Sequence, residues 1–144
     1  MTSPPIPASV GHLPAILQLL ESEGLPVQGL GRATLWVVDD SRGLVAVVGL
    51  EALGSVGLLR SLCVAPRRRG TGMGGTLIEH VAAAAEQRGV TDLFLLTTDR
   101  ARFFERRGFT QVELDQAPRE LDRFQEYREQ CPGDAALLHR LLQP

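Results

Sequence analysis

The sequence is poor in several residue types on which whole classes of protein chemistry depend. It has two cysteines, Cys63 and Cys131, and no lysine, so all 15 of its basic residues are arginine. Two cysteines allow at most one disulfide and no zinc site made of four thiolates. The three histidines lie far apart, without metal-ligand spacing. We therefore expect neither a disulfide scaffold nor a metal site, and no lysine can serve as nucleophile or base.

Long apolar runs and a strong net charge are also missing. No apolar run approaches the ~18 residues of a membrane span, and residues 1–7 have neither the basic nor the apolar region of a signal peptide. The formal net charge is −2, which gives no bulk attraction to nucleic acid or to an anionic membrane. We therefore expect a cytoplasmic protein without a nucleic-acid partner or a membrane partner.

The 144 residues, of which 44% are hydrophobic, fit one ordinary globular domain covering residues 1–144. Hydrophobic periodicity and turn residues predict the elements. The expected helices are 9–24, 74–88, 101–107 and 117–130, and the expected strands are 34–39, 44–50, 56–65, 93–98, 109–114 and 135–142. Prolines in residues 1–8 argue against a regular strand there. The order predicts a mixed α+β domain around one sheet.

A glycine-rich loop with an arginine run lies between the strand ending near Pro66 and the next helix. Glycines 70, 72, 74 and 75 leave backbone N–H groups unscreened, and a helix N-terminus carries partial positive charge. The pattern predicts a diphosphate site. A Walker loop is excluded because no Gly-Lys-Ser/Thr occurs, and a Rossmann fingerprint is disfavoured because the acidic residue expected ~20 positions later is absent. The alternative is a flexible loop with solvated arginines.

Three motifs together carry a family resemblance. They are Leu62-Cys63-Val64-Ala65-Pro66, Arg69-x-x-Gly72-x-Gly74 and Phe103-Phe104-Glu105-Arg106-Arg107-Gly108-Phe109. The chain resembles the GCN5-related N-acetyltransferase (GNAT) family over nearly its whole length. More narrowly, it is similar to small acetyltransferases associated with bacterial arsenic-resistance operons, through Gly49-Leu50-Glu51, Leu59-Arg60-Ser61-Leu62, Leu95-Leu96-Thr97-Thr98 and Cys131-Pro132.

This resemblance implies acetyl-CoA as the acetyl donor, with no metal. In such a fold, strand 56–65 splays away from strand 93–98, and the pantetheine arm pairs with the backbone of Leu62 and Val64. A backbone N–H near Cys63 would face the thioester oxygen as an oxyanion hole. The remaining residues that the resemblance assigns to the cofactor are Arg69, Gly70, Thr71, Gly72, Met73, Gly74, Gly75 and Phe103. Relatives often form homodimers through the C-terminal strands, so a homodimer stays open.

The attacking amine must lose a proton, and Glu51 is the candidate base. It ends an apolar strand, where partial burial would raise its pKa toward neutral; the alternative is an exposed turn carboxylate. Arg60 is a candidate clamp for a substrate carboxylate, and the alternative is a surface salt bridge. Because strand neighbours point to opposite faces, at most one of Arg60 and Ser61 should face the acceptor. Thr97 and Thr98 are placed at the acceptor site as well.

We therefore expect an enzyme that moves an acetyl group from acetyl-CoA to the primary amine of a small molecule. The narrower resemblance suggests an amino-acid-like organoarsenical acceptor in arsenic resistance. Phe104 stands where many relatives have a proton-donating tyrosine, which motivates the alternative of an acyl-CoA sensor without transfer activity. A peptide or protein N-acetyltransferase, and arsenite capture by Cys63 and Cys131, are further alternatives.

Overall fold

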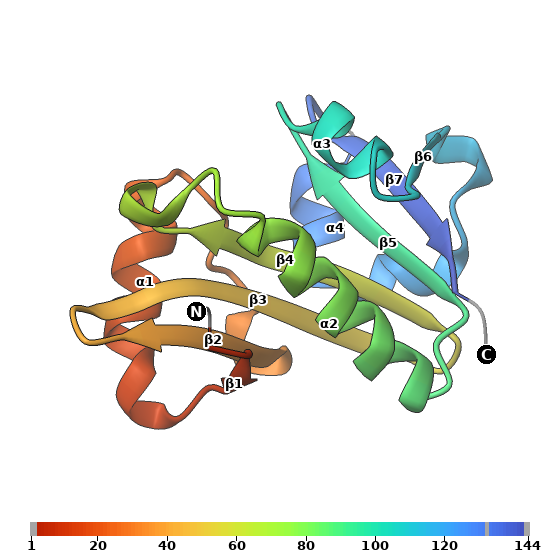
Figure 1. Cartoon of the computed structure of the whole chain (residues 1–144). Helices are drawn as coiled ribbons and strands as arrows, with labels where there is room; N and C mark the ends of the chain where they lie inside the picture. Colours follow the sequence, from red (N-terminus) through yellow and green to blue (C-terminus); the bar gives the residue numbers. More distant parts are fainter. Residues whose placement is uncertain (1–2, 132, 143–144) are drawn as a thin grey trace.

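The computed structural model describes residues 3–131 and 133–142, which form one mixed sheet with helices on both faces (Figure 1). The strands are β1 (Ile6–Pro7), β2 (Thr34–Asp40), β3 (Gly43–Leu53), β4 (Val56–Val64), β5 (Asp92–Thr97), β6 (Thr110–Val112) and β7 (Ala136–Leu141). Their order across the sheet is β1-β2-β3-β4-β5-β7-β6. The helices are α1 (Leu13–Ser22), α2 (Met73–Gln87), α3 (Ala101–Glu105) and α4 (Gln125–Gln130). The predicted α+β class and single sheet are confirmed.

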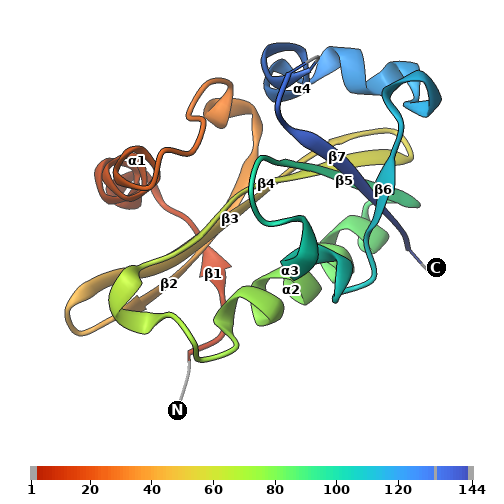
Figure 2. The same cartoon turned by 90° about the horizontal axis from the view of Figure 1, so that it is seen from above.

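The helices cover the two faces of the sheet in pairs. Figure 2 shows α1 and α4 on one side and α2 and α3 on the other. Along β2, Val37 packs in the cluster with α1, whereas Trp36 and Val38 pack in the cluster with α2. The central strand β3 is buried on both faces from Val45 to Glu51, which explains why its sequence is a continuous apolar run instead of an alternating one.

The N-terminal segment begins its α-helix later than Ser9. Ser9 caps a short 3-10 turn over Val10–His12, and α1 begins at Leu13. Pro14 therefore falls in the first turn of α1, where a missing N–H costs no helical hydrogen bond. Before it, β1 pairs Pro7 with Trp36. A proline is tolerated there because β1 is an edge strand.

The predicted splay between the fourth and fifth strands is present. β4 and β5 are parallel and pair only at Val56–Asp92, Gly57–Leu93 and Leu58–Phe94. Beyond these pairs the two strands separate (Figure 1). β5 keeps its register with β7 along all six of its residues. The second half of β4 therefore has a free hydrogen-bonding edge inside the sheet.

The predicted helix over residues 117–130 is wrong in its first half. A 3-10 helix runs over Arg119–Arg123, and only Gln125–Gln130 forms the α-helix α4. The buried anchors Leu121 and Phe124 are three residues apart. A spacing of three suits the 3-10 period better than the α period, and Pro118 lacks the N–H that a longer α-helix would use.

Candidate active site

Two cavities open on either side of the splay and adjoin each other there. The α1/α4 cavity, of about 210 Å³, is lined by the loop after α1, the second half of β4, the end of β5, and α4. The α2/α3 cavity, of about 410 Å³, is lined by the glycine-rich loop, the start of α2, and α3. Their shared lining residues are Leu62, Val64, Arg69, Arg100 and Phe104. A molecule in one cavity can therefore meet a molecule in the other at the free edge of β4.

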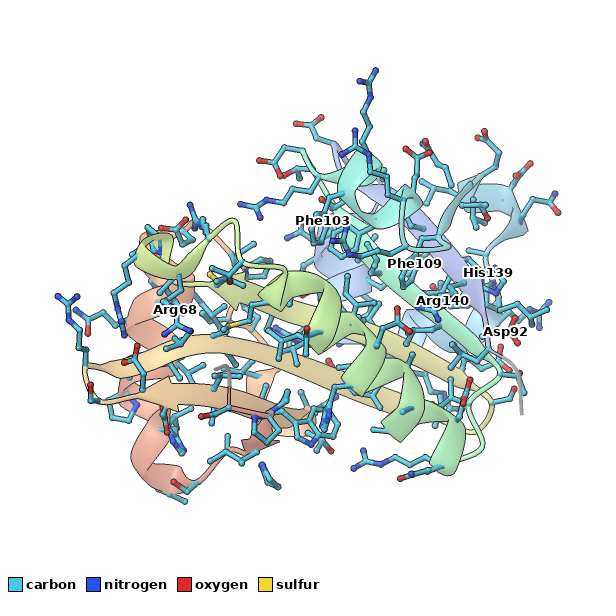
Figure 3. The ribbon with its side chains drawn as sticks, viewed as in Figure 1. Arg68, Asp92, Phe103, Phe109, His139 and Arg140 are labelled. Atoms are coloured by element: carbon cyan, nitrogen blue, oxygen red, sulfur yellow. The ribbon has the colours of Figure 1, made fainter. Side chains whose placement is uncertain are left out.

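The glycine-rich loop is shaped by left-handed backbone and by close packing of two helices. Gly70 and Gly72 have φ angles of 80° and 82°, and Gly72 is the N-cap of α2. A Cβ on Gly74 would lie 2.9 Å from Cζ of Phe103, which reaches from α3 toward the start of α2 (Figure 3). A side chain at this position would force the Phe103 ring to shift. The exposed N–H groups at the start of α2 fit an anion such as a pyrophosphate.

The arginine run is not a free, solvated stretch. Arg67 donates two hydrogen bonds to the Asp40 carboxylate, at 2.7 and 2.9 Å, and Arg68 donates one at 2.9 Å. The Arg67 guanidinium holds the pKa of Asp40 well below its ordinary value. Arg69 pairs with Glu23 and donates from Nε to the Val64 carbonyl at 3.1 Å. The arginines thus tie the loop to the rest of the fold, which argues against a flexible loop.

The backbone of β4 presents Val64, not Cys63, to the splay. The N–H of Ala65 donates to Val45, which lies directly opposite on β3. Hydrogen-bonded pairs alternate along an antiparallel ladder, so the backbone of Cys63 also faces β3. The same alternation turns the N–H and C=O of Val64 toward the splay, and the Val64 carbonyl accepts from Arg69 there. Leu62, beside the bulge, lines both cavities.

The Cys63 side chain packs with α1 residues such as Ile16 and Leu20. Burial raises the pKa of its thiol. The backbone N–H expected near Cys63 is therefore that of its neighbour Val64, which faces the splay; its role as an oxyanion donor stays a prediction.

A bulge in β4 brings Arg60 and Ser61 together. The register with β3 shifts between Val47 and Gly49, and Ser61 has a φ of 60°, the one positive φ among the described non-glycine residues. Both residues line the α1/α4 cavity, and Nε of Arg60 donates to Oγ of Ser61 at 3.1 Å. The prediction that at most one of them faces this site is wrong, because strand alternation does not hold through a bulge.

Arg60 is enclosed by protein groups on every side of its guanidinium. It is 2% exposed, and its NH1 donates to Oε2 of Glu51 at 3.1 Å. Its NH2 donates to the carbonyl of Pro26 at 3.4 Å, and its Nε lies 3.6 Å from Oε2 of Glu126. Each of its three nitrogens is already bonded to a protein group, which argues against the predicted carboxylate clamp. The alternative of a surface salt bridge is wrong, because Arg60 is buried.

Glu51 is buried, as one of its two interpretations required, but it does not line the α1/α4 cavity. Its carboxylate lies behind Arg60. Three acidic residues do line the cavity, Glu23, Asp99 and Glu126. Of these only Glu126, on α4, is buried, at 4% exposed. Burial, assisted by Glu51 and opposed by Arg60, raises the pKa of Glu126 to about 7. The sequence gives no signal for it, since Glu126 is one of many charged residues in a polar segment.

Thr97 and Thr98 both line the α1/α4 cavity; that they contact the acceptor stays a prediction. The Thr97 hydroxyl also accepts a hydrogen bond from the N–H of Arg100 at 3.0 Å, which shapes the turn into α3. The Arg100 side chain makes no ion pair within residues 3–131 and 133–142. It is a cation shared by both cavities.

Comparison with known proteins places this geometry in a family. Residues 31–111 match the model of the acetyltransferase (GNAT) domain, which is more than half of the chain. The chain belongs to the GNAT acetyltransferase family. A similar curated relative is the amino-acid acetyltransferase of Enterobacter sp. (strain 638), which is 41% identical over 63 residues, or 44% of this chain and 14% of the relative. The chain thus spans about a seventh of the length of such relatives.

Solved GNAT structures share the fold of this chain. The N-acetylglutamate synthase of Neisseria gonorrhoeae, complexed with coenzyme A and N-acetyl-glutamate, superposes with a TM-score of 0.84 at 24% identity, over 100% of this chain and 36% of that one. A GNAT family acetyltransferase of Elizabethkingia anophelis with acetyl-CoA bound gives a TM-score of 0.69 at 17% identity, covering 96% and 97%. At these identities the likeness concerns the fold.

Two aromatic residues bear on proton donation in this GNAT domain. Phe104, where many GNAT proteins have tyrosine, is buried between Phe103 and Phe109 and lines both cavities. Tyr127 packs in the cluster with Leu121 and Phe124 and does not line the α1/α4 cavity. Neither residue therefore offers a hydroxyl to the splay.

The described ranges hold no group of three or more His, Cys, Asp and Glu side chains that could bind a metal ion. In the same part of the chain, no helix is both long enough and apolar enough to span a membrane.

Proposed function

We propose that the protein is an N-acetyltransferase that moves an acetyl group from acetyl-CoA to the primary amine of a small molecule. The observation that carries the proposal is the junction of the two cavities at the free edge of β4. A thioester lying along Leu62 and Val64 from one side meets an amine that enters from the other. Holding both reactants in this geometry removes much of the entropic barrier.

The residues around the α2/α3 cavity fit acetyl-CoA. The N–H groups from Arg69 to Gly75, at the start of α2, would hold the pyrophosphate, and Phe103 would border it. The backbone N–H and C=O groups of Leu62 and Val64 would pair with the pantetheine amides. Acetyl-CoA supplies an acetyl group activated as a thioester. One outward N–H of β4 would stabilise the negative charge that develops on its carbonyl oxygen.

The α1/α4 cavity suits a small cationic acceptor. Its volume of about 210 Å³ is below the ~300 Å³ at which drug-sized ligand sites begin, which favours a small molecule over a peptide end. Glu126 and Asp99 supply negative charge for an ammonium, Glu23 being paired with Arg69, and Arg100 supplies positive charge for an acidic group. An amino acid satisfies both, in line with the curated relatives. Amino-acid-like organoarsenicals stay within this proposal through the narrower resemblance alone.

The second candidate is an acyl-CoA sensor that does not transfer the acetyl group. The buried Phe104 favours it, because a phenyl ring cannot protonate the leaving thiolate. A cytoplasmic location, a single domain over residues 1–144 and a homodimer remain predictions from the sequence.

The deciding experiment measures release of free CoA thiol from acetyl-CoA over a panel of amines. The panel holds amino acids, their arsinic and phosphinic analogues, simple alkylamines, polyamines and N-terminal peptides. We expect release with α-amino acids or their analogues and none with peptides. If no amine in the panel releases CoA thiol although acetyl-CoA is shown to bind, the result would favour the sensor.

A further inference from the structure

We propose that Glu126 is the general base of the transfer and the residue that binds the acceptor's ammonium, with Arg60 and Glu51 as positioning residues. This inference rests on the proposed function. Glu126 lies on α4, outside the residues 31–111 that match the family model. Three observations assign the role to Glu126 and not to Glu51: its place on the cavity, its lack of a hydrogen-bond partner among the described residues, and the charge of its surroundings.

The first two observations are geometric. Glu126 lines the α1/α4 cavity, whereas Glu51 lies behind Arg60 and accepts its hydrogen bond at 3.1 Å. The 3.6 Å between Oε2 of Glu126 and Nε of Arg60 is an ion-pair distance, too long for a hydrogen bond. Within the described ranges, no hydrogen bond to the Glu126 carboxylate is found, although buried polar groups normally have a partner. The Glu126 carboxylate lies at the wall of the cavity, where an N–H donor of a bound ligand would supply the missing hydrogen bond.

The third observation is the charge balance around Glu126. The charged and titratable groups nearest to it are Arg60 on β4, Glu51 on β3, and the Cys131 thiol just after α4. Glu23, Asp99, Arg69 and Arg100 line the same cavity, two acids and two arginines that balance each other. The group of Arg60, Glu51 and Glu126 therefore holds one guanidinium and two carboxylates, and an ammonium beside Glu126 neutralises their excess negative charge when both acids are ionised. The pKa of Glu126, raised to about 7 by burial, also suits a base that must gain and lose a proton near neutral pH.

The proton balance of the step is simple. The acceptor enters as R–NH3+ and gives one proton to the Glu126 carboxylate. The free amine forms the C–N bond to the thioester carbon while the C–S bond breaks. A second amine proton ends on the departing sulfur, and the third stays on the amide nitrogen. Glu126 then loses its proton to water through the emptied cavity, so that one proton is released for each acetyl group transferred.

The main test compares the pH profiles of kcat/KM for E126Q and for its matched control E129Q, an exposed glutamate on the same helix. For the wild type we expect kcat/KM to rise with pH around a pKa near 7, and this rise is the acidic limb of the profile. E126Q should lose about 10²- to 10³-fold in kcat and should lack the acidic limb. E126D should recover part of the kcat and part of the limb, and E129Q should match the wild type. An E126Q variant with near-normal kcat and an intact limb would overturn the proposal.

The variant E51Q separates a positioning role from a catalytic one. The Glu51 charge raises the pKa of Glu126, so removing this charge should shift the limb to lower pH without abolishing it. If Glu51 were the base, E51Q would abolish the limb and E126Q would not.

A second measurement does not need turnover. Carbon-detected NMR titration of glutamate carboxyl groups, with the Glu126 signal identified by its loss in E126Q, reports the pKa directly. Saturating propylammonium should lower this pKa by about one unit or more, because an adjacent positive charge favours the carboxylate. An unchanged pKa would overturn the ammonium site. A clear response in a protein that acetylates no amine would contradict the base role and the proposed function together, and would leave the ammonium site standing.

Discussion

At the scale of single residues, the buried trio of Arg60, Glu51 and Glu126 decides how the site behaves with pH. A folded state that raises the pKa of an acid holds its proton more tightly than the unfolded state does. The contribution of Glu126 to the free energy of unfolding is therefore full below pH 4.5 and declines as pH rises toward 7.

This linkage predicts that the difference in the free energy of unfolding between E126Q and the wild type changes with pH. A shift from 4.5 to about 7 corresponds to roughly 3–4 kcal/mol in all, most of which is lost between pH 5 and pH 8. The amide of E126Q does not titrate, so between pH 5 and pH 8 the variant should gain about 2–3 kcal/mol relative to the wild type. Urea unfolding at the two pH values measures this, with E129Q as the control. Parallel pH dependences for wild type and E126Q would contradict the account.

Phe104 provides a second prediction at this scale. A CoA-like thiol, with a pKa near ~8.5, is already a fair leaving group, so proton donation to it is dispensable at neutral pH. F104Y should therefore change kcat by less than ~3-fold. F104L, which also lacks a hydroxyl, should keep a similar kcat and unfold at a lower temperature. A tenfold rise of kcat in F104Y would show that the missing acid limits the enzyme.

At the scale of elements, most of the fold could be predicted from regular sequence patterns. The residues of the proposed acceptor site could not, because they lie in irregular elements. The continuous apolar run of β3 and the glycines of the loop before α2 were readable from the sequence. The bulge at Ser61 was not, because a serine with positive φ has no signature in a strand. Glu126 was missed because α4 is short and held by tertiary packing, and its polar sequence has no marked periodicity.

The bulge predicts different outcomes for two substitutions of Ser61. Its φ of 60° is costly for a β-branched residue, so S61V should destabilise the fold by about 1–2 kcal/mol. S61G tolerates this backbone and should stay within about 1 kcal/mol of the wild type. Thermal unfolding of both variants checks the order. Equal stabilities for S61V and S61G would contradict a left-handed residue at this position.

Close packing of α3 on α2 predicts a selective defect in G74A. The added methyl would lie 2.9 Å from the Phe103 ring and would push it into the α2/α3 cavity. We expect the KM for acetyl-CoA to rise about tenfold or more, which corresponds to a loss of about 1.4 kcal/mol or more in binding free energy. The KM for the amine should change little. The control is A83S, on the exposed face of the same helix. A defect confined to the amine KM would contradict the division of the two cavities.

At the scale of the whole molecule, one sheet separates two kinds of chemistry. The α2 and α3 face, with its helix N-terminus and glycines, suits an anionic cofactor. The α1 and α4 face, whose cavity is lined by the buried Glu126 and by Arg100, suits the ammonium of an amino-acid-like acceptor. The two meet only where β4 and β5 part, so the splay is the structural condition for the reaction.

The most direct test of this account follows a 13C-labelled acetyl group from acetyl-CoA by NMR, with a mixture of small primary amines in one tube. The account predicts that the label passes from the thioester to an amide, at a rate that depends on the amine and is strongly reduced in both G74A and E126Q. Label that stays in the thioester, or appears only as acetate, would contradict the central claim that this chain is an amine acetyltransferase.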